Sequence, residues 1–270
     1  MPRIDTESGP VWKRRTTSKQ WAIWFGWLVA LAITAYAWQG ISEKTIWFFV
    51  QDAPRQAADI GGRMVPPKFS YMSKLWAPIW DTLNIATLGT VIALVIAVPV
   101  AFAAARNTTP HPIVRTIAIF IIVSSRSVNS LIWALMLVFI FGPGVLAGTI
   151  AIGLRSIGFC AKLLYEGIEE IDHTQVEAIE ATGASGAQKM AFGIVPQILP
   201  TFAGIGVFRW DINIRESTIL GLVGAGGIGL ELNGSINTLA WTQVSMILLV
   251  ILLTVIVSEW VSAKVRGAII

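Results

Sequence analysis

The strongest constraint on the fold of this chain is a set of apolar runs, each about long enough to cross a lipid bilayer. A membrane-spanning helix needs about 20 mostly apolar residues, at a rise of about 1.5 Å per residue. Six stretches meet this requirement, and they cover residues 21–38, 80–105, 113–141, 145–165, 198–223 and 241–263. We therefore predict an all-α polytopic membrane protein with six transmembrane helices.

Composition points to the same class of protein. Hydrophobic residues make up 54% of the chain and charged residues only 13%, whereas about 25% of a soluble domain is charged. Tryptophan is common where a membrane meets water. It occurs near the ends of several apolar runs, as Trp21, Trp38, Trp80, Trp241 and Trp260. The single cysteine, Cys160, excludes an internal disulfide, and its apolar neighbours predict a packing role.

The distribution of Lys and Arg predicts the orientation, because these residues concentrate in cytoplasmic segments of membrane proteins. With six spans, eleven of them fall on the side of the N-terminal tail and five on the opposite side, all five within 40–74. We expect both termini in the cytoplasm. Residues 1–19 would form a cytoplasmic tail, 20–79 the first span and an external connection, and 80–270 a core of five spans.

The first apolar run has a second interpretation as a secretory signal. Ala35-Tyr36-Ala37 resembles a small-x-small cleavage site, and basic residues precede the run. The run is longer than the usual core of a signal peptide. We expect an uncleaved anchor, and cleavage would leave the C-terminus on the same side of the membrane.

Charged residues inside the predicted spans are the main sign of function. The intramembrane arginines are Arg126, Arg155, Arg209 and Arg215. Each would cost about 2.5–3.5 kcal/mol at the centre of a spanning helix, so it must face a partner, water or a cavity. Only Asp211 and Glu216 are acids at comparable depth. The resulting positive balance favours a path for anions.

These charges could instead form structural ion pairs. Asp211 and Arg215 are four residues apart and can pair on a helix, whereas Arg126 has no acid nearby in the sequence. Arg126 lies among hydroxyl and amide side chains in the segment 124–130, and a guanidinium fork suits phosphate-like oxyanions. The expected substrate-path residues are Ser124, Ser125, Arg126, Ser127, Asn129, Arg209, Asp211, Asn213, Arg215, Glu216 and Ser217.

A glycine-rich segment, 222–229, follows the fifth predicted span. Its G-x-G-x-x-G spacing resembles a nucleotide-binding fingerprint, but no strand precedes it and it falls on the external side. We expect irregular backbone that packs tightly or lines a cavity. The residues expected at an external gate are Gly224, Gly226, Gly227 and Gly229.

Residues 166–197 form a long polar connection between the fourth and fifth predicted spans. Gly183 is expected to end a helix over 174–181, and a second helical stretch follows at 187–192. Plain links between helices are usually about 2 to 8 residues long. Two short helices around a glycine turn are therefore typical of a docking surface for a soluble partner.

The 166–197 segment resembles the EAA loop of bacterial ABC importer permeases. The matching residues are Glu177-Ala178-Ile179, Gly183 and, after nine further residues, Gly193-Ile194-Val195-Pro196. Over about 81–266 the chain is similar to phosphonate permeases of the PhnE type. Matching motifs include Arg126-Ser127, Phe208-Arg209, Asn213-Ile214-Arg215 and residues 220–229. Asn129 stands where that family tends to have proline.

This resemblance implies the type I ABC importer permease fold. It also implies that the 166–197 segment acts as a cytoplasmic coupling loop, which docks on an ATPase subunit. The residues expected to couple to the ATPase are Glu177, Ala178, Ile179, Gly183, Ala184, Ser185 and Pro196.

By the same resemblance, the chain is expected to be the permease subunit of an importer in the bacterial cytoplasmic (inner) membrane. It would move phosphonate, phosphite or phosphate inward by alternating access. The implied partners are a second copy of the chain, two ABC ATPase subunits, an extracytoplasmic phosphonate- or phosphate-binding protein and the lipid bilayer, with no nucleic acid. The chain lacks the motif G-x-x-x-x-G-K-[ST]. We therefore expect a transport subunit without enzymatic activity or cofactor, with ATP and Mg²⁺ bound by the ATPase.

Three other functions are compatible with parts of the sequence. An ABC permease could carry another small solute such as methionine, although a zwitterion would require balanced charges. An ion-coupled secondary transporter could use Asp211 and Glu216 to carry protons. A membrane hydrolase is disfavoured because the only histidines, His111 and His173, have no second ligand or nucleophile at a matching spacing.

Overall fold

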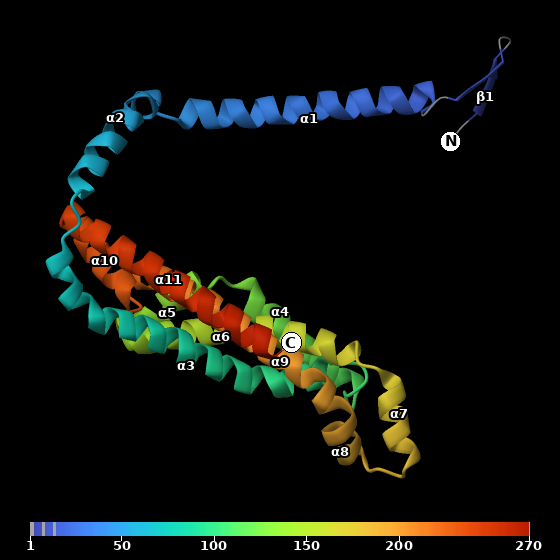
Figure 1. The fold of residues 1–270 in the computed structure, drawn as a ribbon. Coiled ribbons are helices and arrows are strands. Elements are labelled where there is room, and N and C mark those ends of the chain that lie inside the picture. The colour runs from blue at the N-terminus through green and yellow to red at the C-terminus, as the bar shows by residue number, and fades with distance from the viewer. Residues whose placement is uncertain (1–2, 7–8, 13–14, 270) are drawn as a thin grey trace. The chain divides into compact units, whose positions relative to one another are not determined.

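The chain divides into two compact units, and the boundary between them in the sequence lies between Asp59 and Ile60. The computed structural model describes residues 3–6, 9–12 and 15–269 (Figure 1). Lys13 and Arg14, which count toward the predicted cytoplasmic charge of the tail, lie outside the described residues.

The first unit contains a short antiparallel hairpin and a long helix. The strands are β1 (Arg3–Thr6) and β2 (Gly9–Trp12), and helix α1 spans Thr17–Lys44. The 28 residues of α1 extend over about 42 Å, none of them is buried, and most of them are apolar. Such a helix has the length and surface of a membrane span, which confirms the first predicted span. The hairpin was not predicted and is a small addition to a helical chain.

The remaining elements are helical throughout the described part of the chain. In chain order they are α2 (Trp47–Met64), the 3-10 helix η1 (Phe69–Tyr71), α3 (Met72–Ala104), α4 (Pro112–Ser127), α5 (Ser130–Phe141), α6 (Val145–Glu169), α7 (His173–Ala181), α8 (Gly186–Gln188), the π-helix η2 (Lys189–Ile194), α9 (Val195–Gly221), α10 (Ile228–Asn237) and α11 (Trp241–Ile269). The predicted external connection over 40–74 is therefore largely helical. In the second unit, α7 and α8 lie at one end and α10 lies at the other (Figure 1).

Within the described residues, five helical stretches are long and apolar enough to cross a membrane, and a bent pair of helices supplies a sixth. The bent pair is α4 and α5, which meet at 87° within the third span predicted over 113–141. Asn129 begins α5 as its N-cap, because its side chain accepts a hydrogen bond from the backbone N–H of Leu131 at 3.1 Å. An Asn side chain can hydrogen-bond to nearby backbone groups in place of the regular helical bonds, which favours a break in the helix at this residue. The six-span prediction is confirmed when this pair counts as one span.

Helix α6 packs against α3, α4, α5 and α9 through small residues. A Cβ atom at Gly158 would lie 2.5 Å from the carbonyl oxygen of Ile122 in α4. A Cβ atom at Gly148 would lie 2.5 Å from the carbonyl oxygen of Ala225. These glycines let neighbouring backbones approach closely, as small residues do between membrane helices.

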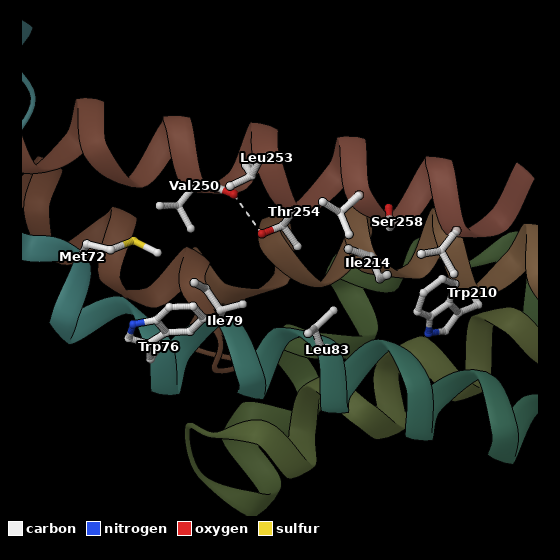
Figure 2. Close-up of a pocket in the computed structure, with 12 residues that line it drawn as sticks. Met72, Trp76, Ile79, Leu83, Trp210, Ile214, Val250, Leu253, Thr254 and Ser258 are labelled. Carbon is white, nitrogen blue, oxygen red and sulfur yellow. Dashed lines mark hydrogen bonds between the residues drawn. The ribbon is translucent and has the colours of Figure 1, made fainter. Parts of the chain in front are cut away.

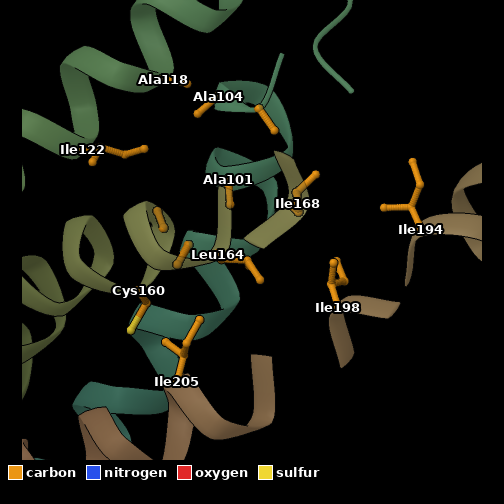
Figure 3. Packing of buried hydrophobic residues seen from close by; sticks show 13 residues of the cluster. Ala101, Ala104, Ala118, Ile122, Cys160, Leu164, Ile168, Ile194, Ile198 and Ile205 are labelled. Atoms are coloured by element: carbon orange, nitrogen blue, oxygen red, sulfur yellow. The ribbon is translucent and has the colours of Figure 1, made fainter. Parts of the chain in front are cut away.

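An apolar cluster joins α3, α4, α6 and α9 (Figure 3). Its members include Ala101, Ala118, Leu164 and Ile198. Cys160 belongs to this cluster and is only 1% exposed. Its surroundings match the expected packing role.

Two glycines of α6 provide a matched test of this packing. Gly158→Ala should lower the melting temperature of the purified protein, because overpacking of a tight contact typically costs about 1–3 kcal/mol. Gly153→Ala makes the same change on the same helix, but its nearest neighbouring atoms would lie 3.6 Å from the new Cβ. That variant should melt no lower than the wild type. Equal melting temperatures for the two variants would contradict the close α4–α6 contact.

Candidate functional site

Helix α9 carries a group of charged and polar side chains inside the bundle. Arg209, Asp211, Asn213 and Ser217 are all buried, in a helix that is otherwise largely apolar. A buried polar group is costly unless it has a partner. The site is therefore defined by the partners that these side chains find on other helices.

Glu216 joins three helices through its carboxylate. It accepts a hydrogen bond from Nη2 of Arg209 at 2.9 Å and pairs with Nε of Arg155 in α6 at 3.1 Å. The hydroxyl of Ser130, at the start of α5, donates to the same carboxylate. One acid thus satisfies two of the four intramembrane arginines and ties the bent span to α6 and α9.

A second set of bonds connects α9 to α6 and α3. Nε of Arg209 donates to the hydroxyl of Ser156 at 2.9 Å, and its guanidinium lies 5.1 Å from the centre of the Phe159 ring. The amide of Asn213 donates to Thr90 at 2.8 Å and to Ser156 at 3.2 Å. These contacts enclose Arg209 on several sides, so it is a poor first contact for a solute in this conformation.

The predicted pair of Asp211 with Arg215 is present, and its geometry confirms the i,i+4 interpretation. The hydroxyl of Ser258 in α11 also donates to Asp211, at 2.8 Å. Asp211 is buried, whereas the side chain of Arg215 is 46% exposed. Arg215 therefore combines a structural partner with accessible donors. Ser217 is buried and donates to the carbonyl of Ile214 at 2.8 Å.

The hydroxyls around Arg126 do not converge on its guanidinium. Ser125 donates to the carbonyl of Leu154 and accepts from the backbone N–H of Gly158 at 2.9 Å, which fastens the end of α4 to α6. Ser127 donates to the carbonyl of Ser124 at 2.9 Å. Arg126 itself is exposed in the last turn of α4 and forms no ion pair with any residue that the structure describes.

Sequence reasoning missed most of these partners. Arg155 was recognised as an intramembrane charge but not as a partner of Glu216, and Ser130 was grouped with Arg126 and not with Glu216. Ser156 and Thr90 were not placed in the site. Each is a polar residue in an apolar helix, which is the signal that could have found it. The contacts between them depend on how the helices face one another.

An apolar groove of about 330 Å³ lies between α3, α9 and α11 (Figure 2). Trp76, Leu83, Trp210 and Leu253 are among the residues that line it. No charged side chain lines this groove, and the hydroxyls of Thr254 and Ser258 at its wall already donate to Val250 and Asp211. The charged cluster is the better candidate for contact with a polar solute.

The glycine segment folds into irregular, tightly packed backbone between α9 and α10, as expected. Gly224, Gly226 and Gly227 have φ angles of 89°, 83° and 73°, which favour glycine. The carbonyl of Gly224 accepts from the backbone N–H of Gly144 at 3.0 Å. A Cβ atom at Gly229 would clash with the carbonyl oxygen of Thr218. The segment thus packs against the beginning of α6.

The 166–197 segment contains the predicted helix as α7. Asp172 caps it by accepting a hydrogen bond from the backbone N–H of Thr174 at 2.9 Å, and Gly183 follows it with a φ of 80°. Gln197 holds the base of the loop through two bonds to the backbone of Asp172, at 2.9 and 3.3 Å. Lys189 pairs with Glu180 at 2.8 Å across the turn.

The second predicted helix, 187–192, does not end before the fifth span. The chain runs through α8 and η2 directly into α9, as one helical stretch over Gly186–Gly221. Pro196 lies where the π-helix η2 passes into α9, as the second residue of α9. The fifth span is therefore longer than the predicted 198–223 and continues into the loop.

The loop presents most of its motif residues on its surface. Glu177, Ala178, Gly183, Ser185 and Pro196 are exposed, and Ile179 and Ala184 are half-buried. A hollow of about 420 Å³ beside them is lined by Ile179, Thr182, Gly183, Ala184, Gln188 and Phe192. Phe192 is 70% exposed. An exposed aromatic ring beside a hollow is suited to binding another protein.

The cap of α7 can be tested by hydrogen exchange. Asp172→Ala removes the side-chain acceptor, and loss of such a cap typically costs about 1 kcal/mol. Amides of α7 should therefore exchange about fivefold faster, since 1.4 kcal/mol corresponds to about tenfold. Asp172→Asn keeps an acceptor oxygen and should exchange like the wild type. Identical exchange in all three proteins would show that the cap does not order this helix.

Comparison with known proteins assigns the chain to a family. Residues 96–267 match the family described as "Binding-protein-dependent transport system inner membrane component". The phosphite transport system permease protein PtxC of Stutzerimonas stutzeri is 42% identical over 209 residues, which cover 77% of this chain and 76% of that protein. The phosphate-import permease protein PhnE of Mycolicibacterium smegmatis is 38% identical over 204 residues, which cover 76% of this chain and 38% of that protein.

Solved structures show the same fold. The MetNI methionine ABC transporter in an inward-facing conformation matches with a TM-score of 0.64 and 20% identity, over 75% of this chain and 99% of that chain. A bacterial ABC transporter for the polysaccharide alginate matches with a TM-score of 0.58 and 15% identity, over 90% of this chain and 99% of that chain. These likenesses confirm the predicted importer-permease fold, and the family match confirms the resemblance found in the sequence. The chain belongs to the family of inner membrane components of binding-protein-dependent transport systems, as a multi-pass ABC importer permease.

Proposed function

We propose that this chain carries a phosphorus oxyanion, such as phosphite, phosphonate or phosphate, across the cytoplasmic membrane into the cell. The observation that carries this proposal is the 42% identity to a permease named for phosphite transport. Further relatives are named for phosphate import and, at 33% identity over 117 residues, for a cryptic phosphonate transport system of Escherichia coli. The shared chemistry of these names is a small anion with oxygens on phosphorus.

The intramembrane arginines support the same class of cargo. Arg126 is exposed and lies within a span, yet a charged side chain is costly against lipid. A water-filled path would satisfy it, and its planar fork of donors fits an oxyanion. In this proposal Arg126 and the accessible donors of Arg215 line the path.

Energy would come from partner proteins. Two ATPase subunits would bind ATP and Mg²⁺, because the chain has no phosphate-binding loop motif of its own. Each would receive one 166–197 segment of a pair of these chains, through the exposed residues around Glu177 and Gly183. An extracytoplasmic binding protein would deliver the anion from the other side. Both chain termini would then lie in the cytoplasm.

Alternating access would follow from the continuous helical stretch Gly186–Gly221. Movement of the ATPases would displace α8, and α9 would transmit this displacement to the helices that it contacts through Glu216 and Asn213. The packed glycines around Gly226 would act as the external gate in this scheme.

The alternative functions have less support. The likeness to the methionine transporter is at 20% identity and concerns the fold. Both acids available to a proton-coupled transporter, Asp211 and Glu216, are engaged by arginines. The family match also favours an ATP-driven system.

The ATPase activity of the reconstituted complex with its binding protein tests the cargo. We expect stimulation by phosphite, phosphonates or phosphate and none by sulfate or methionine. The reason is that, in this proposal, the binding protein and the permease together select an oxyanion of phosphorus. Stimulation by methionine alone, or by no member of the panel, would contradict the proposal.

Arg126 provides a second test in the same complex. Arg126→Ala should lower uptake about tenfold to a hundredfold, because a hydrogen bond to a charged group is worth about 1.5–3 kcal/mol. Assembly with the ATPase should persist. Arg55→Ala removes the same charge from an exposed position in α2 and should transport normally. Normal uptake by Arg126→Ala would exclude Arg126 from the path.

A further inference from the structure

We propose that Arg155 is a further contact for the transported oxyanion, and that Glu216 is an internal counter-anion that shares Arg155 with the cargo. This inference rests on the proposed function and names a residue that the expected path did not include. Three observations support it: the groups that bind the Glu216 carboxylate, the greater exposure of Arg155 than of Arg209, and the net positive charge of the two arginines with one acid.

The groups around Glu216 already form an anion-binding arrangement. Its carboxylate accepts hydrogen bonds from Nη2 of Arg209 at 2.9 Å and from the hydroxyl of Ser130, and it forms an ion pair with Arg155, whose Nε lies 3.1 Å away. Guanidinium and hydroxyl donors are the groups that proteins use for oxyanions of phosphorus as well as for carboxylates. Three helices thus place donors for an anion at one point inside the bundle.

This arrangement is open on the side of Arg155. The exposed fraction of the side chain is 4% for Arg209, 15% for Glu216 and 33% for Arg155. The ion pair of Arg155 uses Nε, and no terminal nitrogen of this side chain bonds to another described residue. A guanidinium carries several N–H donors. Arg155 can therefore bind a second anion without first leaving Glu216.

Charge favours a second anion at this point. Two guanidinium groups face one carboxylate, so the cluster keeps a net positive charge when Glu216 is ionised. An unbalanced charge inside a membrane is costly unless water or a counter-ion meets it. An incoming oxyanion would balance this charge, whereas a cation would be repelled.

Arg155 also lies beside the helix turn that carries Arg126. Ser125, the residue before Arg126, accepts from the N–H of Gly158 at 2.9 Å and lies 3.4 Å from the carbonyl oxygen of Arg155. The backbones of the two arginines thus occupy neighbouring turns of helices in contact. We expect an anion that reaches the exposed end of α4 to pass close to Arg155.

Substitution of Arg155 in the reconstituted complex tests the inference. With saturating binding protein and radiolabelled phosphite or phosphate, Arg155→Ala should lower the maximal uptake rate about tenfold to a hundredfold. Lys162→Ala is the matched control. Lys162 lies two turns along the same face of α6, is 37% exposed and pairs with Glu166 at 3.2 Å. Its loss should leave uptake within about twofold of the wild type, because exposed pairs are worth little.

A cysteine variant separates contact with the cargo from a structural role. Native Cys160 is only 1% exposed, so a cationic methanethiosulfonate reagent should modify mainly the new thiol of Arg155→Cys. We expect the cargo to slow this modification and the attached positive charge to restore part of the uptake. Modification of Lys162→Cys should proceed at the same rate with and without cargo.

The outcomes distinguish this inference from the proposed function. If the wild-type complex transports a phosphorus oxyanion and Arg155→Ala transports it equally well, Arg155 is not a contact. Equal labelling of Arg155→Cys with and without cargo would overturn the inference in the same way, as would loss of subunit assembly in both Arg155 variants. If the wild type transports no phosphorus oxyanion, the proposed function itself fails.

Discussion

The paired carboxylate of Glu216 is the interaction on which the interior of this permease depends. A membrane interior offers little water to a charged group, so each buried charge needs a partner within the protein. Glu216 satisfies Arg209 and Arg155 together and receives the hydroxyl of Ser130. The bent span, α6 and α9 are therefore held in one relative arrangement by the requirement to balance charge.

Close backbone packing makes this polar network feasible. Glycines of α6 bring α4 and the glycine segment within the distance at which a methyl group would clash. At that separation, short hydroxyl side chains such as Ser125 and Ser156 can bond directly to a neighbouring helix. Larger residues at the contacts would separate the helices and leave these groups without partners.

Helix α9 connects the two regions that the proposed function requires. Its inner residues, Arg209 to Ser217, bond to α3, α5, α6 and α11. Its beginning continues through η2 and α8 into the exposed 166–197 segment, whose base Gln197 holds. In the proposed mechanism, this single helix would carry movement from a soluble partner to the charged cluster.

The sequence by itself determined the features that depend on local spacing. Apolar runs predicted six spans, the glycine at 183 predicted the end of α7, and the i,i+4 spacing predicted the Asp211–Arg215 pair. Arg209 and Glu216 are seven apart on one helix face, so that pair was also within reach of sequence reasoning. Only the tertiary structure decided the 87° angle between α4 and α5, the contact of Arg155 with Glu216, and the hydrogen bond from the backbone of α6 to the Ser125 hydroxyl. Hydropathy sets the depth of a residue in the membrane, whereas its partners depend on which faces of the helices meet.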